Sequence, residues 1–123
     1  MPPTLTARET EIMTILWDRG PSTVLEVRDF LDDARPYTTV LSMLRTLEVK
    51  GYLRHDVIGR AHRYTPLVAR DMARRSALRE LTKKLYKGST ALLVAHFLSD
   101  RQLTQDEAER LHQLIAERTR PPK

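Results

Sequence analysis

Cysteine is absent from this 123-residue sequence, which excludes disulfide bonds, a zinc site with cysteine ligands and a cysteine nucleophile. The chain has only four glycines, and none of them belongs to a glycine-rich phosphate-binding loop. The longest apolar stretch, residues 91–98, is interrupted by His96 and is too short to cross a bilayer. The first residues lack the basic and apolar pattern of a signal peptide. We therefore expect a soluble, cytoplasmic protein without membrane insertion.

Groups that support catalysis or metal binding are also scarce. The chain has four histidines, which are His55, His62, His96 and His112. They are scattered and do not have the spacing of a metal-binding motif. The adjacent carboxylates Asp32 and Asp33 fall in a predicted turn, where aspartate is ordinary. We therefore predict no catalytic residues, no metal site and no cofactor, and we do not expect an enzyme.

Charge is unevenly distributed along the chain, whose net charge is +5. Residues 1–34 contain three arginines and seven carboxylates, whereas residues 35–66 contain six basic and two acidic residues. Residues 67–123 contain twelve basic and seven acidic residues. The basic middle segment suits an acidic partner such as a phosphate backbone, although a merely solvated basic surface has the same composition.

Local signals predict six helices. Three T-x-x-E capping boxes mark helix starts, at Thr6/Glu9, Thr23/Glu26 and Thr104/Glu107. We expect Trp17, near the end of the first helix, to pack in the core. The expected helices cover residues 6–18, 24–31, 37–49, 68–86, 90–98 and 104–118, and we expect residues 120–123 to fray.

A β-hairpin is expected after the third helix. Residues 52–57 should pair with residues 61–65 around Ile58, Gly59 and Arg60. A helix followed at once by a basic hairpin is typical of a winged helix-turn-helix. We therefore predict a mainly α (α+β) fold with two domains, a winged-helix DNA-binding domain (1–66) and a three-helix dimerisation domain (67–123).

The third helix has an apolar face and a face rich in hydroxyl groups. At about 100° per residue, its inward stripe is Val40, Met43, Leu44 and Leu47. Its other side carries Thr38, Thr39, Ser42, Arg45 and Thr46. Short hydroxyl side chains suit close approach to base edges in the major groove. We predict that the first three read base edges or nearby phosphates and that Arg45 and Thr46 contact the DNA backbone.

Two further residues of this helix have alternative roles. Leu41 either touches a thymine methyl group or completes the core, and Tyr37 either hydrogen-bonds a phosphate or packs at the helix start. On the hairpin, Arg60, His62 and Tyr64 should share one face and Arg63 the other. We predict that the hairpin binds phosphates, which fixes position without reading sequence.

The three C-terminal helices carry more apolar surface than a lone appendage needs. The helix at residues 90–98 is apolar almost all round, so it requires burial. Burial against a second copy is the preferred interpretation, because a two-fold protein reads an inverted repeat, and a tail folded back on its own domain is the alternative. The residues predicted to form the homodimer are Leu92, Leu93, Phe97, Leu111, Leu114 and Ile115.

Three segments of the sequence resemble the penicillinase-repressor family, the BlaI/MecI type of bacterial transcriptional repressor. They are L-T-x-x-E-x-x-I-M-x-I-L-W (Leu5 to Trp17), Y-T-T-V-L-S-M-L-R-T-L-E-V-K-G-Y-L (Tyr37 to Leu53) and G-R-A-H-R-Y-T-P-L-V (Gly59 to Val68), and a looser match continues through Leu93 to Phe97. The resemblance implies a homodimer that represses transcription by occupying inverted repeats in promoters. The family's recognition positions map onto Thr38, Thr39, Leu41, Ser42 and Thr46.

The resemblance also implies a way of switching the repressor off. In members that control β-lactam resistance, a membrane sensor with a metalloprotease domain triggers cleavage, and the bond between His96 and Phe97 matches the cleaved position. Leu41 and Thr46 stand where staphylococcal resistance repressors have basic residues, so the operator sequence of those repressors does not carry over to this protein. The lack of cysteine argues against the copper-responsive branch of the family.

The preferred hypothesis is a homodimeric DNA-binding repressor of resistance or stress genes. One alternative is a protein-interaction adaptor that kept the fold and lost DNA binding. Another is a winged-helix regulator that senses a small ligand between its two modules. The hydroxyl-rich face and the basic middle segment favour the repressor.

Overall fold

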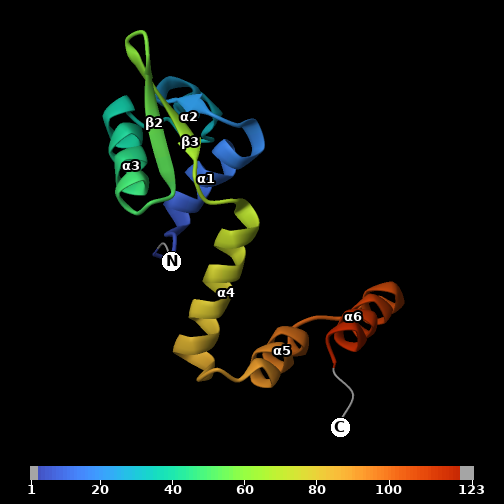
Figure 1. Ribbon diagram of the computed structural model, residues 1–123. Coiled ribbons are helices and arrows are strands. Elements are labelled where there is room, and N and C mark those ends of the chain that lie inside the picture. The colour runs from blue at the N-terminus through green and yellow to red at the C-terminus, as the bar shows by residue number, and fades with distance from the viewer. Residues whose placement is uncertain (1–2, 120–123) are drawn as a thin grey trace. The chain divides into compact units, whose positions relative to one another are not determined.

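The computed structural model describes residues 3–119 and is mainly helical, with a small antiparallel sheet (Figure 1). The predicted fold class is confirmed. The predicted fraying of residues 120–123 lies outside the described residues. In chain order the elements are α1 (Ala7–Arg19), β1 (Ser22–Thr23), α2 (Val24–Phe30), α3 (Tyr37–Val49), β2 (Leu53–Ile58), β3 (Ala61–Pro66), α4 (Arg70–Tyr86), α5 (Thr90–Ser99) and α6 (Gln105–Arg118).

The predicted capping boxes start α1, α2 and α6. In α1 the Thr6 hydroxyl accepts a hydrogen bond from the Glu9 backbone N–H at 3.2 Å, and the Glu9 carboxylate accepts one from the Thr6 N–H at 2.8 Å. Thr23 and Thr104 make the same reciprocal pair of bonds with the glutamates three residues later. Each box satisfies backbone donors that have no partner within the helix.

The sheet has three strands in the order β1-β3-β2, and sequence patterns missed the first strand. Ser22 pairs with Tyr64, and Thr23 pairs with Arg63. Two residues are too short for an alternating pattern, so only the tertiary fold reveals β1. The hairpin is also one residue tighter than expected, because Ile58 pairs with Ala61. Gly59 has φ +61°, a conformation that favours glycine in a two-residue turn.

The N-terminal core lies where α1, α2, α3 and the sheet meet. From the predicted inward stripe of α3, Val40, Leu44 and Leu47 are fully buried, and Met43 is only partly buried. The other buried hydrophobic residues are Ile12, Met13, Leu16, Val24, Val27, Tyr52, Leu53, Tyr64 and Ala73. The core therefore holds α3 by one face and leaves its other face exposed.

The start of α4 belongs with this core. Ala73 is 8% exposed, and the Trp17 indole N–H donates to the Val68 carbonyl at 2.9 Å. Trp17 packs against the core, as predicted. The chain divides into two compact units within α4, one ending at Leu81 and the other beginning at Thr82. The expected boundary between residues 66 and 67 therefore precedes the structural division, and the functional assignment of the two domains stays a prediction.

Candidate nucleic-acid interface

The outward face of α3 carries the residues predicted to read DNA. Thr38, Thr39, Ser42, Arg45 and Thr46 are all exposed. Tyr37, at the start of the helix, is 41% exposed. Leu41 is partly buried and packs against the core, so its side chain lies at the border between core and surface. These placements leave the face of α3 open to a large partner.

A shallow hollow runs along this exposed face. Its lining consists of Thr38, Leu41, Ser42, Arg45, Thr46 and Val49. Thr39 and Tyr37 do not line it, whereas Val49, which sequence reasoning assigned only to the helix end, does. Val49 is 88% exposed. Its spacing of four residues from Arg45 was the signal that could have identified it, because residues four apart share a helix face.

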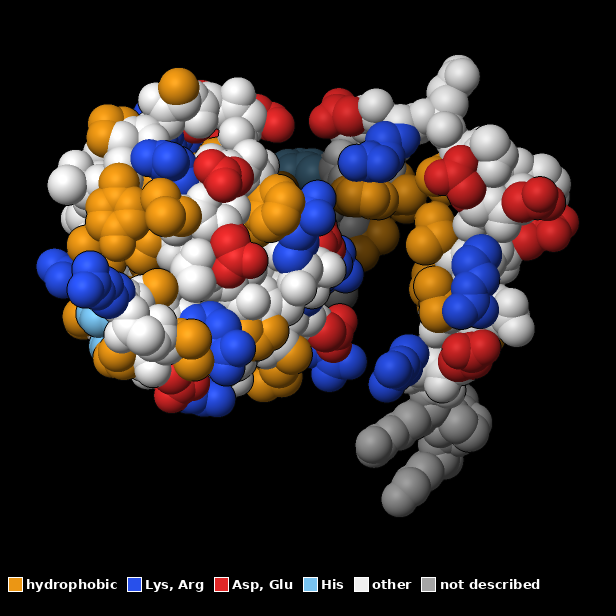
Figure 2. All heavy atoms as spheres, turned by 90° about the horizontal axis from the view of Figure 1, so that it is seen from above, with side chains coloured by type: hydrophobic (Ala, Val, Ile, Leu, Met, Phe, Trp, Pro, Cys, Tyr) orange, Lys and Arg blue, Asp and Glu red, His pale blue; other side chains and the backbone are white. Residues whose placement is uncertain are grey.

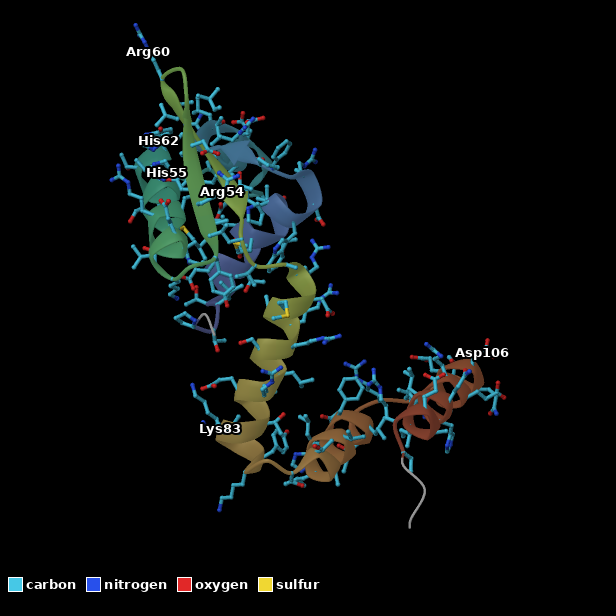
Figure 3. The ribbon with its side chains drawn as sticks, viewed as in Figure 1. Arg54, His55, Arg60, His62, Lys83 and Asp106 are labelled. Carbon is cyan, nitrogen blue, oxygen red and sulfur yellow. The ribbon has the colours of Figure 1, made fainter. Side chains whose placement is uncertain are left out.

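The wing, formed by β2 and β3, presents three arginines to solvent. Arg60 projects from the tip of the hairpin, and Arg54 lies on β2 (Figure 3). Arg63 is exposed on β3. Arg63 stands opposite Asp56 in the β2–β3 register, and Asp56 accepts a hydrogen bond from Arg54 at 2.6 Å. Arg54 and Arg63 therefore both lie near the Asp56 carboxylate, which partly offsets their positive charge.

His62, on β3 of the wing, is linked to α3 through His55. Its ring stacks on that of His55 with 4.6 Å between centroids, and the His55 Nδ1 lies 2.8 Å from the Glu48 carboxylate of α3 (Figure 3). On the same strand face, Tyr64 is fully buried. Burial raises the pKa of the Tyr64 phenol and nearby Glu48 raises it further, whereas Arg45 beside it partly offsets the rise. The face shared by His62 and Tyr64 thus packs toward α3, and DNA contact by His62 stays a prediction.

Ion pairs fix both ends of α3 to α1. Before its N-terminus, the nearly buried Arg35 donates to Glu11 at 2.7 Å and pairs with Asp33 at 2.8 Å. The hydrogen bond to Asp33 raises the pKa of Arg35. Burial lowers this pKa, but the bond to Glu11 raises it further, so the net change is a rise. After the C-terminus of α3, Lys50 donates to Glu9 at 2.7 Å. Sequence reasoning placed Glu9 in a capping box and Asp33 in a turn, and it did not identify the role of these ion pairs in positioning α3.

The C-terminal unit exposes the residues predicted to form the dimer. Leu92, Phe97, Leu114 and Ile115 are between 39% and 61% exposed, while Leu93 and Leu111 are partly buried. Hydrophobic side chains gather along one side of this unit, and charged ones lie on the other (Figure 2).

The predicted cleavage bond lies within α5 of the same unit. His96 Nδ1 is 3.3 Å from the Tyr86 hydroxyl, and the Arg101 guanidinium lies 4.2 Å from the centre of the Phe97 ring. His96 and Phe97, the two residues joined by the bond, are both exposed. In the part of the chain that the structure describes, no group of three or more metal-ligating side chains is arranged to hold a metal ion, and no helix combines the length and apolar character needed to cross a bilayer.

A helix with an open face, supported by a three-helix core and followed by a basic two-stranded wing, defines a winged-helix DNA-binding protein. A family model described as "Penicillinase repressor" matches residues 5–117. The chain belongs to this family of BlaI/MecI-type DNA-binding transcriptional repressors, and the predicted resemblance is confirmed.

Similar curated proteins span nearly the whole chain. The penicillinase repressor of Bacillus licheniformis is 27% identical over 117 residues, covering 94% of this chain and 91% of the relative. The transcriptional regulator BlaI of Mycobacterium tuberculosis is 33% identical over 113 residues, covering 89% and 80%. The methicillin resistance regulatory protein MecI of Staphylococcus aureus is 25% identical over 114 residues, covering 90% and 92%.

Solved structures agree on the fold. The solution structure of the DNA-binding domain of the repressor BlaI is 28% identical with a TM-score of 0.53, covering 58% of this chain and 90% of that domain. The complex structure of hsRosR-S4 shares the fold at 17% identity, with a TM-score of 0.52 and coverage of 92% and 88%.

Proposed function

We propose that this protein acts as a homodimer that occupies inverted-repeat operators of resistance or stress genes. The observation that carries the proposal is the open face of α3, held by ion pairs at both ends and flanked by the wing. A helix positioned so firmly reads a rigid groove at little entropic cost. The similar proteins include a penicillinase repressor and a methicillin resistance regulatory protein, which supports resistance genes as targets.

The assignment of contacts follows from exposure. Thr38, Thr39 and Ser42, in the N-terminal half of α3, read base edges, while Arg45 and Thr46 bind the backbone. Tyr37, Arg60 and Arg63 bind phosphates, and His62 supports the wing from its stack with His55. Phosphate contacts set position, and base contacts specify the sequence.

Dimerisation is assigned to the apolar side of the C-terminal unit. Solvent exposure of Leu92, Phe97 and Ile115 on two neighbouring helices is costly for a monomer, because each side chain stabilises the fold only when buried. A second copy of the same unit buries these residues symmetrically. The dimer presents two copies of α3 to the two halves of an inverted repeat.

Selection of bound duplexes from random DNA tests this function directly. A two-fold symmetric consensus is expected, with affinity falling by about 10³- to 10⁵-fold between about 50 and 200 mM salt if roughly six to ten phosphates are contacted. Failure to recover any consensus would instead support the adaptor alternative. A consensus without two-fold symmetry would contradict binding as a dimer to an inverted repeat.

Two substitutions separate sequence reading from positioning. Thr39→Ala is expected to relax preference at one or two bases and to cost about 1–3 kcal/mol on the best site. Arg63→Ala is expected to weaken all sequences alike and to make the salt dependence shallower. Anisotropy on matched and mismatched duplexes measures both effects, and the reverse pattern shows that the roles are exchanged.

Cleavage between His96 and Phe97 is proposed as the way the repressor is switched off, with a membrane sensor metalloprotease as the partner. The bond lies inside α5, so cutting it separates α6 from the rest of the chain. Without α6 the dimer loses part of its interface. Loss of the dimer lowers the effective affinity for the full operator, because the two half-sites are no longer bound together. The test inserts a site for an unrelated protease at this bond and follows mass and operator affinity. A cut protein that stays dimeric and keeps full affinity excludes this mechanism.

A further inference from the structure

The hollow on α3 is chemically unusual for a surface that reads DNA. Side chains that hydrogen-bond a base through two atoms are arginine, lysine, asparagine and glutamine. The sequence of α3, YTTVLSMLRTLEV, contains only one of these, Arg45. Two residues that line the hollow, Leu41 and Val49, are wholly apolar, and Thr38 and Thr46 each add a methyl group.

The polar groups in the hollow are partly committed within the protein. The Thr46 hydroxyl donates its hydrogen to the Ser42 carbonyl at 3.0 Å, so that hydrogen is not offered to a base. Arg45 lies beside the buried Tyr64 hydroxyl. Beside the remaining hydroxyl and guanidinium donors, the hollow therefore presents several methyl groups.

The two apolar side chains occupy different levels of the same helix face. Leu41 packs against the core at its inner side, so its position is fixed, whereas Val49 is 88% exposed. They are eight residues apart, which at the helical rise corresponds to about 12 Å along α3. Base pairs are about 3.4 Å apart along each strand, so a distance of about 12 Å is long enough for the two side chains to reach different base pairs.

We propose that α3 also reads thymine through its 5-methyl group, with Leu41 and Val49 as further specificity-determining contacts beside the hydroxyl side chains. The thymine methyl is the apolar feature that a base pair presents in the major groove. Each half-site then contains thymines whose methyl groups enter the hollow and cover Leu41 or Val49. This inference rests on the proposed function and adds the base and the atom that the site recognises.

Replacing thymine by deoxyuridine removes only the methyl group and keeps every hydrogen-bonding atom of the base pair. The experiment takes the consensus duplex, replaces each thymine in turn and measures the affinity of the full chain by anisotropy at fixed salt. At one or two positions in each half-site, the affinity is expected to fall about fourfold per methyl group, the value for one buried methyl-sized group. The other thymines are expected to be insensitive.

Variants connect the sensitive positions to the proposed side chains. Leu41→Ala or Val49→Ala is expected to abolish the difference between thymine and uracil at one position and leave it intact at the other. Because Val49 is almost fully exposed, Val49→Ala does not disturb the core, and it keeps the test valid if Leu41→Ala unfolds. Leu25→Ala is the matched control, since Leu25 is 51% exposed on α2 and does not line the hollow.

The outcomes separate this inference from the proposed function. A consensus whose affinity is unchanged by uracil at every position overturns methyl reading and leaves the repressor function standing. A loss with uracil that persists undiminished in both the Leu41→Ala and Val49→Ala proteins also overturns it. Failure to recover any consensus overturns both proposals together.

Discussion

The two units of the chain differ in where their hydrophobic side chains lie. The unit ending at Leu81 buries twelve hydrophobic residues, seven of them on α1, α2 and α3 at 0% exposure. From Thr82 to Thr119 no residue is buried, although α5 is the most apolar helix. The first unit therefore contains its own core, whereas the described helices of the second unit do not bury that unit's apolar side chains. This difference is the strongest physical argument for a partner at the C-terminal unit.

The largest expected effect tests whether the N-terminal core stands alone. Leu44→Ala removes a fully buried side chain of α3 and is expected to lower the free energy of unfolding by about 2–5 kcal/mol. Urea unfolding, followed by circular dichroism at several protein concentrations, measures the change. Leu78→Ala is the comparison on α4, where the side chain is 55% exposed, and a loss as large as that of Leu44→Ala would contradict the proposed difference.

A charge placed in the apolar C-terminal surface tests the proposed dimer. Phe97→Asp is expected to give a monomer whose affinity for the full operator is at least about 100-fold lower, because the two half-sites are no longer bound together. Sedimentation equilibrium and anisotropy measure the two changes. Leu25→Asp is the matched control, since Leu25 and Phe97 are both 51% exposed. An unchanged mass for Phe97→Asp would place the interface elsewhere.

The link between α1 and α3 provides a pH-dependent test inside the N-terminal unit. Burial alone would raise the pKa of Glu9, but the hydrogen bonds from Lys50 and Thr6 outweigh it and hold the pKa below 4.5. The ionised form is therefore the one that stabilises the fold. This stability is fully present above the ordinary pKa of 4.5 and is lost as the pH falls through the lowered pKa.

We accordingly expect Glu9→Gln to cost about 1–3 kcal/mol at neutral pH, with the difference from the unaltered chain shrinking as the pH falls below about 4. Thermal unfolding across this pH range is the measurement, and Lys50→Met should reproduce the pattern. Glu26→Gln changes the same position of the α2 capping box, where the glutamate accepts from the Thr23 backbone N–H, and serves as control. A cost that is independent of pH would show that the ion pair is not its source.

The smallest expected effect compares one local change in the two units. Thr6→Ala and Thr104→Ala each remove a capping hydroxyl and should cost about 1 kcal/mol. Thr6→Ala should lower stability equally at all protein concentrations. Thr104→Ala removes the cap of α6, which lies in the proposed dimer interface. The loss of stability should therefore depend on the protein concentration. Equal concentration dependence for both variants would argue against the division of roles between the units.

Local sequence patterns predict most of the local features of this chain. The bounds of α3, residues 37–49, follow from its apolar spacing and from Gly51, which has φ +90° just after the helix. The capping boxes were equally readable, because a cap depends on residues only three positions apart. The exposed reading face of α3 follows from the same spacing, since burying one face of an amphipathic helix leaves the other in solvent.

Tertiary structure alone decided which distant residues meet. Arg35 and Glu11 are 24 residues apart and Lys50 and Glu9 are 41 apart, so no local pattern identifies them as the pairs that tie α3 to α1. The strand β1 forms because the backbone groups of Ser22 and Thr23 pair with those of Tyr64 and Arg63 on β3. Long-range pairing depends on how the elements pack. A sequence pattern relates only residues that are a few positions apart, on one helix turn or along one strand, so it does not identify such pairs.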